Sequence, residues 1–257
     1  MKTLVMLLIL FNSINGPAVR GALVSLKNEL YRAQRFVEQP QSVQPAKIEP
    51  PAEMNLLVPF AMQAPFSYWG MPYQEACEEA ALILADKYFR NSALTKKIMD
   101  AEIKKLIEWE KQKFGLFTDT TVEEMKQIAV EYFGLNVKID DDVSVENIKR
   151  QIAAGKLVLA PTAGRDLKNP FYKQPGPLYH ILVIRGYTQT LFITNDVGIG
   201  RGFGYKFDFQ TVIDAVHDLP LKENGEVFRP YDENIDSVEK EIKMRQGRKV
   251  ILIVSKD

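Results

Sequence analysis

Between residues 75 and 154, apolar residues recur three to four positions apart, which is the spacing of one face of an α-helix. A first helix is predicted over 75–89, where Ala80, Leu84 and Tyr88 follow a spacing of four. Further helices are expected over 94–114, 121–133 and 144–154. The third begins at Thr121 in a capping box, T-V-E-E, and stops before Gly134.

After residue 156 the pattern changes to short runs of β-branched and aromatic residues, which predict strands. We expect these strands at 157–160, 179–187, 191–194, 205–207 and 250–254, with an earlier one at 135–139. Helices are expected again at 209–216 and 235–245. Because most helices precede most strands, the pattern predicts an α+β domain, a helical half packed on a mostly antiparallel sheet. An active site would then lie in the cleft between the two halves.

The amino-terminal region reads differently from the rest. The apolar run 4–11 follows Lys2 and ends in small and polar residues up to Gly16, which is typical of a secretory signal peptide and too short to span a bilayer. The alternative is an uncleaved amphipathic anchor helix that continues to Phe36. Residues 37–51 are rich in Pro and Gln and predict a linker.

These boundaries predict three parts: a signal peptide or membrane anchor at 1–16, an amphipathic segment with linker at 17–55, and one folded domain at 56–257. The expected location is secreted or associated with the cell envelope, with a membrane tether if the apolar segment is retained.

Composition narrows the choice of partners. The chain has 33 Lys and Arg against 33 Asp and Glu, so no net field attracts nucleic acid, and no basic patch with interleaved aromatic residues occurs. One cysteine allows no internal disulfide, and two histidines make a His-rich metal site hard to build. Carboxylates alone could still bind calcium or magnesium. We expect a monomer without cofactor or metal that binds no nucleic acid.

The single cysteine, Cys77, lies at the start of the first predicted helix. Backbone N–H groups and the helix dipole favour the nucleophilic thiolate there. The adjacent Glu78 and Glu79 oppose it by their charge. They project about 100° and 200° around the helix axis from Cys77, so neither need face the thiol. The alternative for Cys77 is a small buried hydrophobic residue.

His180 opens one predicted strand and Asp196 ends the next, so a hairpin brings them together. With a two-residue turn, His180 falls opposite Val197, and a turn changed by one residue or a bulge places it opposite Asp196. A carboxylate beside a histidine fixes its tautomer and stabilises its cation, as in nucleophile–base–orienter catalysis. A hydrogen-bonded sheet histidine is the alternative for His180, and His217 is interpreted as structural.

Acyl transfer also needs donors for an oxyanion. The Cys77 backbone N–H is one, Gln63 is the first side-chain candidate and Gln74 the second. Trp69 either forms a wall of the cleft or packs in the core. The glycine-rich run 198–204 superficially suggests a phosphate-binding loop, but it lacks the following Lys-Ser/Thr and helix, so we interpret it as a tight turn between strands.

Three strings carry a resemblance to a known family: VPFAMQAPFSYWGMPYQEACEEAA, NPFYKQPGPLYHILVIRGY and FITNDVGIGRGFGYKF. Together they resemble the standalone bacterial branch of cysteine peptidase family thirty-nine, a papain-like group whose best-known members trim double-glycine leaders from bacteriocins. The resemblance covers residues 58–207. It implies a papain-like catalytic domain with Gln63 as oxyanion donor, Cys77 as nucleophile, His180 as base and Asp196 as orienter.

The chain departs from the leader-trimming members in two ways. Glu78 and Glu79 stand where those members have Gly-Pro after the cysteine, and these 257 residues contain no transporter domain. We therefore expect a bacterial thiol-dependent peptidase or amide hydrolase that acts on a peptide or protein through an acyl-enzyme. Two alternatives stay open: a catalytically weak or inactive module of the same fold that binds peptides or cell-wall fragments, and an acyltransferase or transpeptidase.

Overall fold

The computed structural model describes residues 21, 24–29, 49–115, 117–231 and 234–256. The chain divides into two units, residues 1–48 and 49–257. In the first unit, residues 24–29 are helical, whereas the predicted signal segment 1–16 lies outside the described residues. Throughout the described ranges, no helix has both the length and the apolar character needed to cross a bilayer. The predicted boundaries at 16 and 55 stay predictions.

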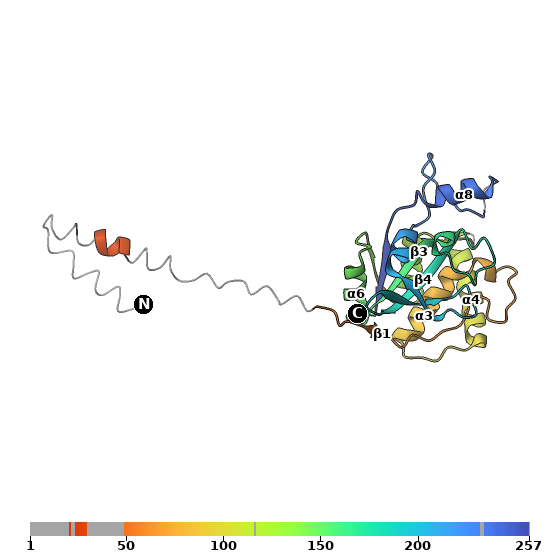
Figure 1. Cartoon of the computed structure of the whole chain (residues 1–257), viewed down its shortest axis with the longest axis horizontal. Helices are drawn as coiled ribbons and strands as arrows, with labels where there is room; N and C mark the ends of the chain where they lie inside the picture. Colours follow the sequence, from red (N-terminus) through yellow and green to blue (C-terminus); the bar gives the residue numbers. More distant parts are fainter. Residues whose placement is uncertain (1–20, 22–23, 30–48, 116, 232–233, 257) are drawn as a thin grey trace. The chain divides into compact units, whose positions relative to one another are not determined.

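The helices of the second unit lie close to the predicted ranges (Figure 1). The α-helices are α3 (Cys77–Phe89), α4 (Lys96–Phe114), α5 (Val122–Glu131), α6 (Val145–Ala153), α7 (Phe209–Ala215) and α8 (Ser237–Met244). Two short 3-10 helices, η2 (Tyr73–Glu75) and η3 (Gly164–Leu167), were not predicted.

Side chains cap most of these helices at their first turn. Thr121 and Glu124 form the capping box predicted for α5, and Thr95, Ser144 and Asp236 accept backbone N–H groups at the starts of α4, α6 and α8. Helix α3 differs, because its N-cap residue Ala76 offers no side-chain acceptor. The uncapped end of α3 is the end that carries Cys77.

The strands form a sheet in the order β2-β7-β3-β4-β5-β6, and β1 pairs with β4. Every pairing between these strands is antiparallel. The strands are β1 (Met54–Asn55), β2 (Asn136–Asp140), β3 (Leu157–Ala163), β4 (Tyr179–Tyr187), β5 (Leu191–Asp196), β6 (Phe203–Asp208) and β7 (Ile251–Ser255). The α+β class and the antiparallel sheet predicted from the sequence are therefore confirmed.

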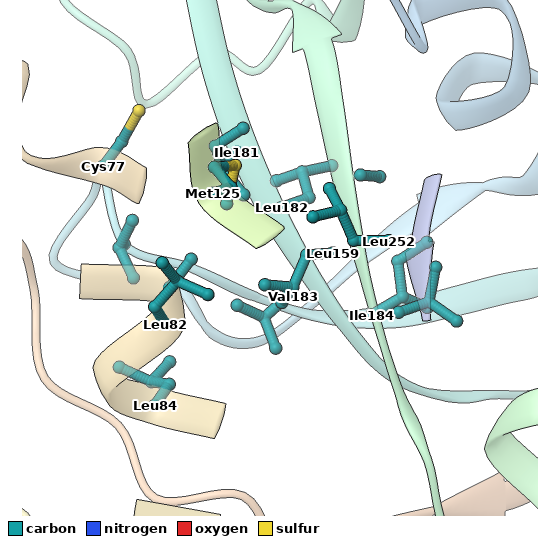
Figure 2. Close-up of a cluster of buried hydrophobic side chains, with 14 of the residues drawn as sticks. Cys77, Leu82, Leu84, Met125, Leu159, Ile181, Leu182, Val183, Ile184 and Leu252 are labelled. Atoms are coloured by element: carbon teal, nitrogen blue, oxygen red, sulfur yellow. The ribbon is translucent and has the colours of Figure 1, made fainter. Parts of the chain in front are cut away.

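The core lies on both faces of β4, whose residues are all buried. Helices α3 and α6 both contact this strand, and Figure 1 places them on different sides of β3 and β4. Figure 2 shows Leu82 and Leu84 of α3 among buried side chains of β4, with Cys77 at the edge of the cluster. The sulfur of Cys77 points away from Leu82 and Leu84 (Figure 2), although the residue itself is buried with the cluster.

The β4–β5 hairpin has a different register from either of the two we predicted. Tyr187 pairs with Phe192, so the connecting loop covers 188–191 and is longer than two residues. A bulge near Arg185 then shifts the register by one residue. Both predicted registers were wrong, because the strand residues alone do not reveal the loop length or the bulge.

In the observed register Asp196 pairs with Leu182, which places His180 diagonally across from it on the same face. Diagonal neighbours on a sheet lie within reach of long side chains. The predicted juxtaposition of His180 and Asp196 is therefore present in spite of the wrong register.

Candidate active site

The His180 imidazole and the Asp196 carboxylate are buried against each other, with Nε2 of His180 2.8 Å from Oδ1 of Asp196. His180 comes from the first residues of β4 and Asp196 from the last residue of β5. Because Nε2 is directed at a carboxylate, a neutral ring carries its proton there and leaves Nδ1 free to accept one. The pair thus has the geometry of a histidine oriented by a carboxylate.

Three further donors hold Asp196 in place. Gly198 N–H donates to Oδ1 at 3.0 Å, while Asn169 Nδ2 and the Tyr172 hydroxyl donate to Oδ2 at 3.1 and 2.7 Å. Burial and the neighbouring carboxylate raise the pKa of Tyr172 well above its ordinary value, so the phenol keeps its proton and remains a donor. The carboxylate is therefore fully hydrogen-bonded although no part of it reaches solvent.

Asn169 and Tyr172 were not predicted as site residues. They lie in the loop before β4, 27 and 24 residues from Asp196 in sequence, and no local pattern connects them to it. The only signal was their position in the string N-P-F-Y, shortly before the histidine strand. The Tyr172 ring also contacts His180 edge to face, with centroids 5.6 Å apart.

The glycine-rich loop between β5 and β6 packs against this pair. A Cβ at Gly198 would lie 2.9 Å from Cε1 of His180, and a Cβ at Gly202 would lie 1.8 Å from the Asp196 carbonyl oxygen. Both positions therefore require glycine for steric reasons. As predicted, the loop connects two strands, and Gly198 and Gly200 additionally line the cleft described below.

Cys77 is the first residue of α3 and is buried, 4% exposed. Its Sγ lies 2.9 Å from Oε2 of Glu78, and no hydrogen bond joins it to His180 in the described part of the chain. Helix geometry left the orientation of Glu78 open, and in the structure its carboxyl faces the thiol. The Glu78 side chain is long enough to fold back toward Sγ, and Thr120 N–H binds its other oxygen, Oε1, at 2.7 Å.

Acidic side chains surround the thiol. Burial, followed by the charges of Glu78 and Asp119, raises the pKa of Cys77 well above its ordinary value. Burial and the charge of Glu79 raise the pKa of Glu78 to about 8. These neighbours therefore outweigh the helix dipole and favour the protonated thiol in the free protein.

Glu79 of α3 and Glu110 of α4 lie behind Glu78. No donor at hydrogen-bonding geometry meets their carboxyl oxygens among the described residues. The two carboxyls interact with each other, and burial is the first cause of the raised pKa of both. A bond between two carboxyls requires that one of them keep its proton. This part of the site is therefore buried and only partly satisfied.

Cys77 and His180 line the same cleft, which has a volume of about 680 Å³. Gln63, Gln74 and Trp69 also line it, and the half-exposed Trp69 forms part of the wall, not of the core. Asp196 lies behind His180 and does not line the cleft. His217 lies elsewhere, with Nδ1 against the Ala215 carbonyl, as its structural interpretation predicted.

The candidate side-chain oxyanion donors already bind other groups, whereas His180 is oriented with Nδ1 free to accept a proton. Gln63 is buried in the wall of the cleft, but its Nε2 already donates to the carbonyls of Tyr73 and Gln74, at 2.9 and 3.2 Å. Its Oε1 accepts no hydrogen bond from the residues that the structure describes. A flipped amide would direct Oε1 at two carbonyl oxygens, so this orientation is the favourable one. Gln63 would have to release one of these bonds to serve an oxyanion, and Gln74 donates to Glu75 instead.

Comparison with known proteins identifies the family. The model of the Peptidase_C39 like family matches residues 56–213, more than half of the chain. The chain belongs to this family. Membership of the C39-like family suggests a cysteine peptidase, and the matched range includes Gln63, Cys77, His180 and Asp196.

Other comparisons of this C39-like protein are more distant. A solved structure from Bacillus anthracis, of a protein assigned to the C39-like peptidases, is similar with a TM-score of 0.40 and 16% identity. The match covers 79% of this chain and 98% of that one. No residue role is inferred from it. No curated protein matches the chain.

Proposed function

We propose that this C39-like protein is a cysteine peptidase that cleaves peptide or amide bonds through an acyl-enzyme. Cys77 is the nucleophile, His180 the general base and acid, and Asp196 the group that orients His180. His180 takes the thiol proton as the sulfur of Cys77 attacks the substrate carbonyl carbon, so the S–H bond breaks and a C–S bond forms. The C–N bond then breaks as His180 gives that proton to the departing amine. His180 then takes a proton from water, which attacks the acyl-enzyme and releases Cys77.

The observation that carries the proposal is the oriented His180–Asp196 pair on the same cleft as the single cysteine. Nucleophile and base are often farther apart in a free enzyme than in its substrate complex, so the missing Cys77–His180 hydrogen bond is compatible with catalysis. The cleft, at about 680 Å³, is large enough for several residues of a peptide.

Mass-spectrometric profiling of a peptide library tests this function. Wild type should generate new peptide ends that Cys77→Ala does not, and His180→Ala should lose most of them. Asp208→Asn, an exposed carboxylate at the end of β6, is the matched surface control and should cleave like wild type. A library left intact by wild type, or cut equally by Cys77→Ala, would contradict the proposal.

A second candidate is a binding module that keeps the fold without turnover. The Cys77 thiol bonded to Glu78, together with the Gln63 amide already bonded to two carbonyls, favours it. Binding of library peptides that survives in Cys77→Ser, without any cleavage by wild type, would support this candidate. Added amines separate a third candidate, a transferase, because amide products would then replace the hydrolysed ends.

A further inference from the structure

The contact between Cys77 and Glu78 is a part of the cleft that the proposed mechanism leaves unused. Sγ and Oε2 are 2.9 Å apart and both residues are buried, so a hydrogen bond joins them. Once the pair has lost one of its two protons, the remaining proton lies between sulfur and oxygen. The heavy atoms fit two descriptions equally well. Either the thiol donates to a carboxylate, S–H···⁻O, or a carboxylic acid donates to a thiolate, O–H···S⁻.

Glu78 is held firmly enough to take either role. Its Oε1 accepts the backbone N–H of Thr120 at 2.7 Å, in the segment that leads into α5. This bond leaves Oε2 as the oxygen available to the sulfur. Because the anchor comes from a residue 42 positions away, the carboxyl is placed by the tertiary fold and not by helix geometry alone.

The groups that face Glu78 come from three other elements as well as its own helix. Glu79 is the next residue of α3, and its charge acts on Glu78. Glu110 of α4 also interacts with Glu78 through its charge. Asp119, from the segment before α5, adds its negative charge to that around the thiol. From β4, the Tyr179 hydroxyl experiences the charge of Glu78. An ionised Glu78 is therefore surrounded by acidic groups, which favours its neutral form.

Transfer of the proton removes the main electrostatic obstacle to a thiolate. After burial, the charge of Glu78 is the largest cause of the raised thiol pKa. Once Glu78 holds the proton, that charge is gone and its O–H donates to the sulfur. The pair keeps a single negative charge before and after the transfer, so the move does not add charge to the buried site.

We propose that Glu78 is a catalytic residue that takes the Cys77 thiol proton on Oε2 and holds the thiolate through an O–H···S⁻ hydrogen bond. The S–H bond breaks, the O–H bond forms, and the electron pair stays on sulfur. The inference rests on the proposed peptidase function. Glu78 takes the thiol proton in place of His180, which enters the cycle as imidazolium with a proton from solvent. His180 protonates the departing amine and then, as imidazole, takes a proton from the attacking water, which restores the imidazolium, while Glu78 keeps its proton throughout.

A thiolate titration tests this role without any substrate, so its result is independent of whether a peptide is cleaved. Cys77 is the only cysteine, and the ultraviolet absorbance of wild type minus that of Cys77→Ala isolates its thiolate. Glu78→Gln is the decisive variant, because its amide can accept from Thr120 and donate to sulfur while never taking a proton. Glu78→Met removes the donor. Glu79→Gln is the control, because it replaces a neighbouring buried carboxyl that makes no bond to sulfur.

The proposal predicts that thiolate midpoints in wild type and Glu78→Gln agree within about half a pH unit, since both place a neutral donor against sulfur. Glu78→Met should raise the midpoint by about one unit or more, because the donor is lost. When Glu79→Gln is added to wild type and to Glu78→Gln, the thiolate midpoints of the two resulting proteins should still agree within about half a pH unit.

Infrared spectroscopy provides a second readout if Glu78→Met does not fold. The carbonyl band of a protonated carboxyl, isolated as wild type minus Glu78→Gln, should persist above the thiolate midpoint. A Glu78→Gln midpoint far below that of wild type would mean that the carboxylate suppresses the thiolate, which overturns the proposal. Equal midpoints in all variants, or loss of the carboxyl band before the thiolate forms, would reduce Glu78 to an anchor for Thr120 and also overturn it.

Discussion

On the sheet side of the cleft, the buried Asp196 carboxylate accepts hydrogen bonds from His180, Asn169, Tyr172 and Gly198. On the helix side, the equally buried carboxyl of Glu79 meets no donor at hydrogen-bonding geometry in the described part of the chain. Both sides have removed carboxyl groups from water. The first has replaced the water with fixed donors, whereas on the second burial raises the pKa of the carboxyls and favours their protonated form.

This difference separates a rigid half of the site from a titrating half. Fixed donors hold the His180 ring in one orientation and its proton on one nitrogen, which is what a base requires. Carboxyls that share protons instead make the charge around Cys77 depend on pH. In the proposed mechanism, the reactivity of Cys77 therefore depends on protonation of its surroundings, and the action of His180 depends on the orientation of its ring.

Asp196→Asn should give the largest loss, because it removes the charge and places an amide N–H against the donors that now bind the carboxylate. We expect kcat/KM to fall by about 10²–10⁴ and the free energy of unfolding to fall by about 1–3 kcal/mol. Steady-state kinetics and urea unfolding measure the two effects. Unchanged kinetics would show that the sheet side plays no part in the chemistry.

Gly198→Ala should move the His180 ring, since the added Cβ would lie 2.9 Å from Cε1. A displacement near 1 Å is enough to lower kcat by about 10²-fold. Gly200→Ala is a matched control in the same loop and on the same cleft, because its Cβ would meet only Met62 Sδ at 3.6 Å, an ordinary contact. Equal activity of the two variants would refute the steric requirement at Gly198.

Tyr172→Phe should have a smaller effect, because it removes one of the bonds to Asp196 and leaves the others. We expect kcat to fall about tenfold, the value of one hydrogen bond to a charged group, with little change in KM. Tyr68→Phe is the control, since Tyr68 is exposed and its ring contacts Tyr73 without touching Asp196. A KM effect without a kcat effect would place Tyr172 in substrate binding instead.

Glu110→Gln should change stability and leave activity nearly unaltered. Burial raises the pKa of Glu110 from 4.5 to about 8, so between these values the folded state binds more protons than the unfolded state. Stability from this group is therefore complete below the lower pKa and is lost as pH rises through the higher one. Between about pH 5 and about pH 9, the free energy of unfolding should therefore fall less in Glu110→Gln than in wild type, by roughly 1 kcal/mol or more.

Urea unfolding at both ends of that range measures the change. Lys97→Gln, an exposed substitution near the start of α4 and away from the cleft, should follow the wild-type dependence. A Glu110→Gln protein that loses as much stability as wild type would show that Glu110 titrates normally.

The elements and the positions of the main site residues could be predicted, because both depend on local patterns. Helices α3 to α8 followed apolar spacing and caps, and His180 and Asp196 followed from the order of two adjacent strands. Strand β3 was predicted too short because it contains Pro161. The structure tolerates that proline because β7 pairs only with Leu157–Leu159, so no strand requires its missing N–H on that side.

The supporting contacts could not be predicted, because they join segments far apart in sequence. The Glu78 carboxyl is directed toward Cys77 while it accepts the backbone N–H of Thr120. Asp196 accepts a hydrogen bond from Asn169, which lies in a loop without a regular sequence pattern. Helix geometry gives the direction in which a side chain leaves the backbone. It does not give the rotamer of a long side chain with a distant partner.

If the two sides of the cleft act as one Cys–His site, His180 should control the reactivity of Cys77, and alkylation of Cys77 by iodoacetamide measures that reactivity without a peptide substrate. Wild type should react faster than His180→Ala around neutral pH, by about tenfold for each unit by which His180 lowers the thiol pKa. As a control, Glu79→Gln should react faster than the double variant Glu79→Gln/His180→Ala by the same factor that separates wild type from His180→Ala. Equal alkylation rates in wild type and His180→Ala across the pH range would contradict the claim.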